Sequence, residues 1–516
     1  MLYINTKKPF ENFLELYNEY YFVDKSNIIA NINTKISTKS KYICITKPRR
    51  FGKSSIANML GAYYTKGVET KDIFDKLNIS KNSTYNIHLN RYNVIYITFN
   101  KMPDYGSTYN DYIEMIKSNL IKDLKELYPS LKDTEFFTIS DMLSNTNEKF
   151  IFIFDEWDYI FANNLFIENQ NDFLEFLRNF LKDEPYVALA YMTGVLPIKK
   201  YSSGSALNMF DEYTMLNDMI YGEYFGFTEK EVMKLCEKQE KISFDEISDW
   251  YNGYINEEED KIYNPRSVVK ALQNGKCISY WTNTGAMDEV KDYLAYNILD
   301  IREDIVEMVA GEEIDIVITE EYRAGQKTPG TKKEIYAAMI ILGFLSYHDG
   351  SLRIPNKELM LEFEKAISDE SFGYVSEIIS SSKQMLKATI EKNEKIVQDI
   401  LQDIHNSEIP ILQYNDENSL SCVLTLAYLS ARDRYRIERE EKSGKGYADF
   451  SFHPRRKKDP AIIVELKKDE DVNVALKQII DKDYALKFKK EYNKVLAVAI
   501  SYNSKKKNHK CIIKEI

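Results

Sequence analysis

The sequence is poor in the residues that mark secreted or membrane-bound proteins. Its 516 residues contain only five cysteines, and none of them form a C-x-x-C pair, so we predict neither a disulfide framework nor a zinc site. The longest apolar run, at residues 335–345, is far shorter than the ~20 residues that span a bilayer. Residues 1–13 carry charged side chains and lack the apolar core of a secretory signal. We therefore expect a cytoplasmic protein with no membrane partner.

Basic residues are fewer than acidic residues, and they are distributed unevenly along the chain. The chain has 69 Lys and Arg against 80 Asp and Glu, a formal net charge of −11, which argues against a protein that coats nucleic acid. Residues 441–516 instead contain 19 Lys and Arg and 11 Asp and Glu, so this tail carries +8 and the preceding residues carry −19. Its basic clusters at 455–458 and 505–510 suit a phosphate backbone, although a solvated loop would explain either cluster alone.

The order of apolar segments predicts an α/β fold. In the first 200 residues, β-branched and aromatic runs alternate with amphipathic stretches, which is typical of a parallel sheet flanked by helices. The strands expected there are 42–46, 94–99, 150–154 and 186–193. From about residue 229 the periodicity is helical and includes a long amphipathic stretch at 378–404. The last hundred residues return to strands, expected at 444–452, 461–466 and 495–501 around a helix near 474–488.

A candidate phosphate-binding loop follows the first strand. Residues 47–54 are Lys-Pro-Arg-Arg-Phe-Gly-Lys-Ser. In a P-loop, main-chain N–H groups hold the phosphates, the lysine reaches the β- and γ-phosphates and the serine ligates Mg²⁺. Gly52, Lys53 and Ser54 occupy those positions, and Ser55 continues the loop into the next helix. Lys47 stands where the first glycine is expected, so the loop departs from the usual motif at that position.

Two further strands end in side chains that suit phosphate chemistry. Asp155 and Glu156 follow the strand at 150–154, where Asp155 would hold Mg²⁺ through water and Glu156 would polarise the attacking water. Thr193 ends the next strand and could sense the γ-phosphate. Because ligands bind at the carboxyl ends of strands in open α/β sheets, we expect these residues to share a site. The alternative is an ordinary turn and helix cap after a buried strand.

A third group of candidate residues lies near the C-terminus. Asp449 follows a glycine-rich turn at 444–446, and Glu465 and Lys467 would share one face of the strand at 461–466. If Asp449 lies on an adjacent antiparallel strand, the two carboxylates could hold Mg²⁺ that activates water. Lys467 would then orient that water or stabilise the developing charge. The alternative is a surface hairpin with an ordinary Glu/Lys face.

Taken together, these motifs resemble the predicted AAA-ATPase-like proteins that carry a C-terminal PD-(D/E)XK nuclease-superfamily domain. The matching segments are 46–54, 154–158, 193–195, 225–229, 250–254, 263–265, 444–449, 464–467 and 475–484. The resemblance implies functional roles for Lys53, Ser54, Asp155, Glu156, Asp449, Glu465, Lys467 and Gln478. Family members usually lack the first P-loop glycine, so Lys47 counts less against the motif. Arginine is commoner at the position of Ala448, and we identify no arginine finger.

We therefore predict an α/β protein of four regions. These are an AAA-ATPase-like P-loop domain at 1–218, its helical lid at 219–286, a helical connecting region at 287–405 and a PD-(D/E)XK nuclease-like domain at 406–516. The expected cofactors are ATP and Mg²⁺. The nucleotide-binding candidates are Gly52, Lys53, Ser54, Ser55, Asp155 and Thr193. The metal-binding candidates are Ser54, Asp155, Asp449 and Glu465. The catalytic candidates are Glu156, Asp449, Glu465, Lys467 and Gln478.

The expected function is that of an ATP-binding, ATP-hydrolysing protein coupled to a Mg²⁺-dependent nuclease domain that acts on DNA or RNA. A nucleotide-dependent switch or scaffold is the alternative, in which the nuclease-like domain only binds nucleic acid or a protein partner. The sequence leaves a homo-oligomeric assembly open.

Overall fold

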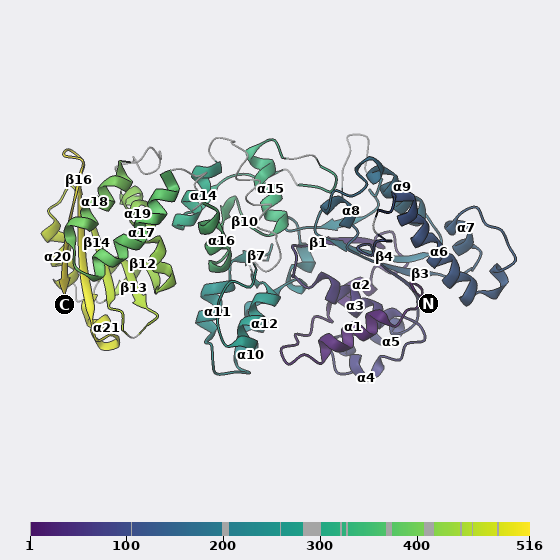
Figure 1. The fold of residues 1–516 in the computed structure, drawn as a ribbon. Helices are drawn as coiled ribbons and strands as arrows, with labels where there is room; N and C mark the ends of the chain where they lie inside the picture. The colour runs from purple at the N-terminus through teal and green to yellow at the C-terminus, as the bar shows by residue number, and fades with distance from the viewer. Residues whose placement is uncertain are drawn as a thin grey trace. The chain divides into compact units, whose positions relative to one another are not determined.

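The computed structural model divides the chain into two compact units (Figure 1). It describes residues 2–104, 106–198, 206–258, 260–281, 301–319, 322–326, 329–367, 374–406, 417–443, 446–456, 458–481 and 484–516. The first unit comprises Met1–Ala286 and Asp315–Leu359, and the second comprises Met287–Ile314 and Met360–Ile516. Both units combine sheets with helices, which confirms the α/β class. Among the described helices, none is long and apolar enough to cross a membrane.

A five-stranded parallel sheet forms the centre of the first unit. Its strands are β1 (Tyr42–Thr46), β2 (Asn93–Thr98), β3 (Phe150–Asp155), β4 (Val187–Gly194) and β5 (Asp211–Tyr213), in the spatial order β2-β3-β4-β1-β5. The first four lie where the sequence predicts strands. Because β4 lies between β1 and β3, its residue Thr193 is paired with Ile45 on one side and with Asp155 on the other.

Apolar side chains bury both faces of this sheet, which explains the nearly continuous apolar runs in the sequence. Along β3, Phe152 and Phe154 pack on one face with α6 (Tyr109–Leu127), α7 (Ile139–Ser144) and α9 (Gln170–Leu181). Ile151 and Ile153 pack on the other face with α1 (Lys8–Tyr17), α2 (Ile28–Asn33) and α3 (Lys53–Tyr64). Alternate side chains of one strand therefore belong to two cores.

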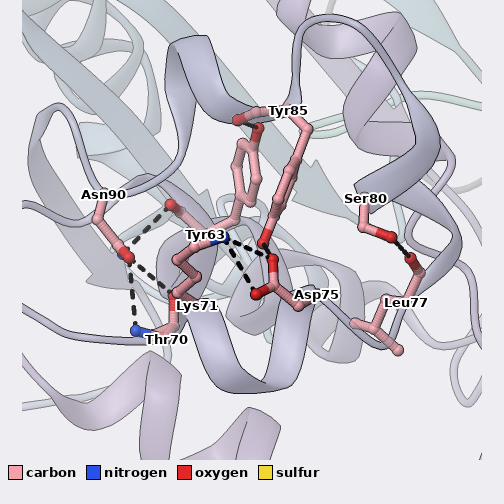
Figure 2. A network of polar contacts seen from close by, with 8 residues as sticks. All are labelled: Tyr63, Thr70, Lys71, Asp75, Leu77, Ser80, Tyr85 and Asn90. Carbon is pink, nitrogen blue, oxygen red and sulfur yellow. Dashed lines mark hydrogen bonds and ion pairs between the residues drawn. The ribbon is translucent and has the colours of Figure 1, made fainter.

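A polar network fixes the connection between α3 and β2 (Figure 2). This connection contains α4 (Lys71–Phe74), the 3-10 turn η1 (Asn78–Lys81) and α5 (Tyr85–His88). The Asp75 carboxylate accepts hydrogen bonds from the Lys71 ammonium and the Tyr85 hydroxyl, both at 2.8 Å. The Tyr63 hydroxyl donates to the Tyr85 carbonyl at 2.8 Å. Because Tyr63 belongs to α3, the network anchors the far end of the helix that Lys53 begins.

Three helices and a small sheet follow the central sheet in sequence. The helices are α10 (Glu229–Cys236), α11 (Phe244–Tyr251) and α12 (Pro265–Asn274). The small sheet has the order β6-β8-β7, with β6 at Phe227–Thr228, β7 at Tyr254–Ile255 and β8 at Lys261–Tyr263. The Asn264 side chain caps α12 by accepting hydrogen bonds from the main-chain N–H groups of Arg266 and Ser267. The helices α10 and α11 agree with the helical periodicity that the sequence predicts from about residue 229.

Residues 315–359 return to the first unit after the chain has entered the second. They include α15 (Lys332–Leu342), β10 (Ser346–His348) and β11 (Ser351–Arg353), and the short strand β9 (Ile314–Asp315) joins β11. Gly253 (φ 133°) lies so close to this segment that a β-carbon there would be 1.4 Å from the Pro355 carbonyl oxygen. The Tyr254 hydroxyl donates to the Gly343 carbonyl at 2.6 Å. The residues at which the four predicted regions begin and end stay a prediction.

The second unit is built on a five-stranded mixed sheet. Its strands follow one another in space, with β12 at Tyr435–Ser443, β13 at Gly446–Pro454, β14 at Ala461–Lys468, β15 at Val495–Asn503 and β16 at Asn508–Glu515. Only β14 and β15 are parallel. The helix α20 (Val472–Asp481) packs on one face through Ala475 and Ile479 against Ile463 and Ala497.

Helices cover the opposite face of this sheet as well. They include α17 (Tyr374–Ile390), α18 (Glu394–His405) and α19 (Glu417–Ala427). The His405 ring of α18 stacks on Tyr502 of β15 with centroids 4.2 Å apart. The single amphipathic stretch predicted at 378–404 is therefore two helices, because the chain turns at Lys392 (φ 59°). Other described helices are α8 (Tyr159–Ala162) in the first unit, and α14 (Ile301–Ala310), α16 (Lys357–Ile367) and α21 (Tyr484–Glu491) later in the chain.

Candidate functional site

The loop between β1 and α3 has the geometry of an anion-binding turn. Gly52 has φ 88° and precedes the first residue of α3, and open space surrounds the position where a β-carbon would stand. Glycine adopts this left-handed conformation at little cost. The turn leads directly into a helix of 12 residues, whose first N–H groups are available to an anion. Lys53 is 8% exposed, and its ammonium donates to the Pro48 carbonyl at 2.7 Å.

Asp155 and Lys53 are both buried, and burial makes the charged form of each less favourable. Asp155 is 4% exposed, and burial raises its pKa to about 6 although a hydrogen bond with Ser54 lowers it. Burial lowers the pKa of Lys53 to about 8 although the nearby carboxylates of Asp158 and Asp155 raise it. The Oδ1 atom of Asp155 is buried and has no hydrogen-bond partner among the described residues. An uncompensated carboxylate oxygen beside a serine hydroxyl fits a hard divalent cation such as Mg²⁺.

Asp158 is a buried acid that the sequence motifs did not assign. Its Oδ2 accepts hydrogen bonds from the main-chain N–H groups of Val195 at 2.9 Å and Leu196 at 2.7 Å. A β-carbon on Gly194 would lie 2.3 Å from its Oδ1. Asp158 therefore fixes the chain where it leaves β4. The signal in the sequence was a third carboxylate within three residues of Asp155.

Thr193 lies next to this group but its hydroxyl is used within the sheet. The side chain is fully buried, and its Oγ1 donates to the Ile45 carbonyl at 2.9 Å. This hydrogen bond joins β4 to β1. The expected contact of Thr193 with a γ-phosphate stays a prediction.

Lys47, which stands where a P-loop has its first glycine, has a structural role in this chain. Its ammonium forms an ion pair with Asp218 at 2.8 Å, and both side chains are buried. Its main-chain N–H donates to the Gly194 carbonyl at 3.2 Å. The Lys47 side chain therefore points into a structural ion pair, while the turn required by the loop is made at Gly52.

A cavity of about 670 Å³ contains the loop and the catalytic candidate Glu156. Such a volume is typical of small-molecule sites. Its polar part is lined by residues 49–55, Glu156, Asp158, Gly194 and Val195. Its apolar part is lined by Phe13, Leu16, Phe22, Met59, Tyr224 and Phe227 among others. The cavity is therefore lined by charged as well as by apolar and aromatic side chains. Asp155 and Thr193 are not among the residues that line the cavity.

Two arginines in the cavity are functional candidates that the motifs missed. Arg49 and Arg266 are exposed and line the cavity, and their guanidinium groups make no hydrogen bond or ion pair with any described residue. Arg50 differs, because it donates to the carbonyls of Tyr280 and Trp281. Arg266 belongs to α12, which also contributes Val269, Lys270 and Gln273 to the lining. The helical spacing of these four residues was the available sequence signal.

The second unit brings Asp449, Glu465 and Lys467 together. The paired residues of β13 and β14 end at Phe450 and Val464, so Asp449 and Glu465 are the next opposed positions. The Asp449 carboxylate accepts the Leu466 N–H at 2.6 Å. The Lys467 ammonium lies 3.2 Å from the Glu465 carboxylate, which is 1% exposed. Burial lowers the pKa of Lys467, but Glu465 and Asp449 more than offset this and raise it above its ordinary value.

The remaining candidates of this site are less closely placed. Gln478 lies half-buried on α20 and makes no hydrogen bond to the three residues within the part of the chain that the structure describes. Gly444, Lys482 and Asp483 lie outside that part. The described residues contain no group of three His, Cys, Asp or Glu side chains suited to a metal ion. The adjacent carboxylates of Asp449 and Glu465 still fit a cation whose other ligands are water and main-chain oxygens.

Comparison with known proteins assigns both regions. Residues 9–203 match the model of a predicted AAA-ATPase family, and residues 415–511 match the PD-(D/E)XK nuclease superfamily. A search of curated proteins finds no match. Among solved structures, a Walker-type ATPase of Pyrococcus abyssi aligns at 11% identity and a TM-score of 0.34, over 66% of this chain and 94% of that one. The chain therefore joins a domain of the predicted AAA-ATPase family to a C-terminal domain of the PD-(D/E)XK nuclease superfamily.

Proposed function

We propose that the first unit binds and hydrolyses ATP with Mg²⁺ and that the second cleaves phosphodiester bonds of DNA or RNA, with the nucleotide state controlling cleavage. The observation that carries the proposal is the cavity of about 670 Å³ in which the Lys53 loop, Glu156 and two unpaired arginines meet. The convergence of Asp449, Glu465 and Lys467 supports the nuclease half.

In the first unit, the N–H groups at the start of α3 would bind the β- and γ-phosphates. Lys53 would exchange the Pro48 carbonyl for a phosphate oxygen, which returns a counter-charge to a buried ammonium. Magnesium bound near Ser54 and Asp155 would neutralise phosphate charge. Glu156 lines the cavity and would accept a hydrogen bond from the attacking water, while Arg49 and Arg266 would stabilise the charge that develops on the transferred group.

In the second unit, the carboxylates of Asp449 and Glu465 would hold a divalent cation that lowers the pKa of bound water. Without a bound cation the two carboxylates raise the pKa of Lys467, and the ordinary pKa of a lysine, about 10.4, already leaves the side chain protonated at neutral pH. Its ammonium would therefore orient the attacking water or stabilise the pentavalent phosphate.

Activity measurements on the full chain test both halves. We expect ATP turnover and cleavage of end-labelled DNA or RNA with Mg²⁺ or Mn²⁺. Lys53→Ala should abolish turnover, and Glu465→Ala should abolish cleavage while turnover remains. Lys395→Ala on α18 serves as a control, because that side chain is exposed.

The outcomes separate the two sites. Unchanged ATP affinity in Lys53→Ala would refute the nucleotide site. Absence of cleavage by the wild type with either metal would refute the nuclease half. Nucleotide binding without turnover, together with DNA binding that Glu465→Gln leaves intact, would select the switch or scaffold instead.

A further inference from the structure

A row of side chains crosses three strands beside the nuclease-like site. Lys467 of β14 is paired with Ser501 of β15, which is paired with Lys510 of β16. Paired residues on neighbouring strands lie on the same face of a sheet, and neighbouring strands lie about 4.8 Å apart. Lys510 is therefore about 10 Å from Lys467 at the main chain, on the face that also carries Glu465.

The turn between β15 and β16 adds three more lysines near this row. Lys505, Lys506 and Lys507 are exposed at its tip. The N–H and hydroxyl groups of Ser504 donate to the Asp469 carboxylate at 2.7 and 2.8 Å. Asp469 lies two residues beyond Lys467. The hydrogen bonds therefore hold the tip at the end of the sheet where Lys467 lies.

The three lysines of the turn and Lys510 can bind a negatively charged ligand. Lys505, Lys506, Lys507 and Lys510 make no ion pair with any described residue, and Lys505 and Lys510 act on Asp469 and Asp471 only from a longer distance. The nearby acids already accept hydrogen bonds: Asp469 from Ser504, and Asp471 from Asn473 at 2.8 Å. Glu470 is the third acid of this segment, and Lys468 adds a further positive charge. Lys467 is paired with Glu465, and without this pair five lysines stand here against three carboxylates.

We propose that Lys467, Lys510 and the tip lysines 505–507, which we call the lysine edge, bind successive phosphates of a nucleic-acid strand and lead it past Glu465. The inference rests on the proposed nuclease function. A row about 10 Å long with a basic tip beyond it contacts the backbone rather than the bases, so the lysine edge positions the strand without reading its sequence. The shared chemistry is the phosphodiester backbone, which a duplex and a single strand both present.

Salt dependence of binding tests the lysine edge. Fluorescence anisotropy of labelled 20-nucleotide duplex and single-stranded probes, without divalent metal, gives the affinity of the full chain between 50 and 200 mM salt. Each phosphate contact contributes about 0.9 to the slope of log K against log salt on duplex DNA and about 0.7 on a single strand. Lys510→Ala should lower the slope by about one contact. Replacing lysines 505–507 together by alanine should lower it by about three contacts and weaken binding at 100 mM salt by at least tenfold.

A charge-matched control uses Lys383, Lys387 and Lys395, which are exposed on α17 and α18. Their joint replacement by alanine removes the same charge and should leave the slope within about half a contact of the wild type. Equal losses in the control and tip variants, or an unchanged slope in the tip variant, would overturn the lysine edge. If the wild type binds neither probe, both the lysine edge and the proposed nuclease function are refuted. If the wild type binds and the tip and Lys510 variants bind equally well, only the lysine edge is refuted.

Discussion

The buried charge of Asp155 predicts that removing it stabilises the nucleotide-free protein. The pKa of this carboxyl is raised from 3.8 to about 6 by burial. One pKa unit corresponds to 1.36 kcal/mol, so ionised Asp155 costs the folded state about 3 kcal/mol above pH 6. Asp155→Asn keeps the shape without the charge. We therefore expect the variant to unfold with a free energy about 3 kcal/mol higher than the wild type at pH 8.

The pH dependence has a definite sign. Because the folded pKa lies above the ordinary value, the cost is present above pH 6, falls to about half at pH 5 and vanishes below about pH 3.8. Urea titrations at pH 5 and pH 8 measure it, with tryptophan fluorescence as the signal, since all three tryptophans lie in the first unit. Asp133→Asn, at an exposed loop position, should change nothing.

Ligand binding should reverse the order of stability. Saturating MgATP should stabilise the wild type more than Asp155→Asn, because the variant loses the carboxylate that we propose binds the cation. An Asn variant that is less stable than the wild type at pH 8, or a difference that does not vary with pH, would refute the reasoning.

Two further substitutions test other parts of the site. Lys47→Met should lower the free energy of unfolding by about 3 kcal/mol, because it leaves Asp218 charged and buried, and adding Asp218→Asn should restore most of the loss. Urea titration measures the stability of both variants. Equal stability of the single and the double variant would contradict a stabilising ion pair. Arg266→Ala should lower kcat for ATP at least tenfold, because it removes positive charge from the part of the cavity that we propose binds phosphates. Steady-state assays measure this, with Lys230→Ala, at an exposed position on α10, as the control. An equal effect of the two substitutions would show that Arg266 has no specific role in ATP hydrolysis.

The sequence predicted the buried strands better than the edge strands. The runs at β1 and β3 are apolar on both faces, so composition alone marks them. The short β5, and β12 and β16 at the edges of the second sheet, were not predicted. Their sequences mix charged residues with apolar ones because one side of an edge strand faces solvent. Pairing with a neighbouring strand, which local composition does not encode, makes them strands.

In the candidate site, the residues of local motifs were predicted from the sequence, whereas the residues that only the fold brings together were not. Lys53 and Asp155 lie in local motifs whose spacing along the chain carries the signal. The ion pair of Lys47 with Asp218 joins residues 171 positions apart, and only the fold brings them together. The helical spacing of Arg266, Val269, Lys270 and Gln273 places them on one face of α12, but only the fold shows that this face lines the cavity.

The close approach of Gly253 to Pro355 bears on how such proteins can be recombined. The unit that holds the nucleotide cavity is discontinuous in sequence, since residues 315–359 follow a segment of the other unit. A crossover at residue 286 that replaced everything downstream would remove the Gly343 carbonyl, which accepts the hydrogen bond of the Tyr254 hydroxyl. The buried hydroxyl would then have no partner, which lowers the stability of the fold by about 1–3 kcal/mol. The crossover would also uncover the main chain at Gly253. Exchange of the nuclease-like unit therefore requires either a later junction, beyond residue 359, or two coordinated ones, which favours joint inheritance of the two units over free shuffling.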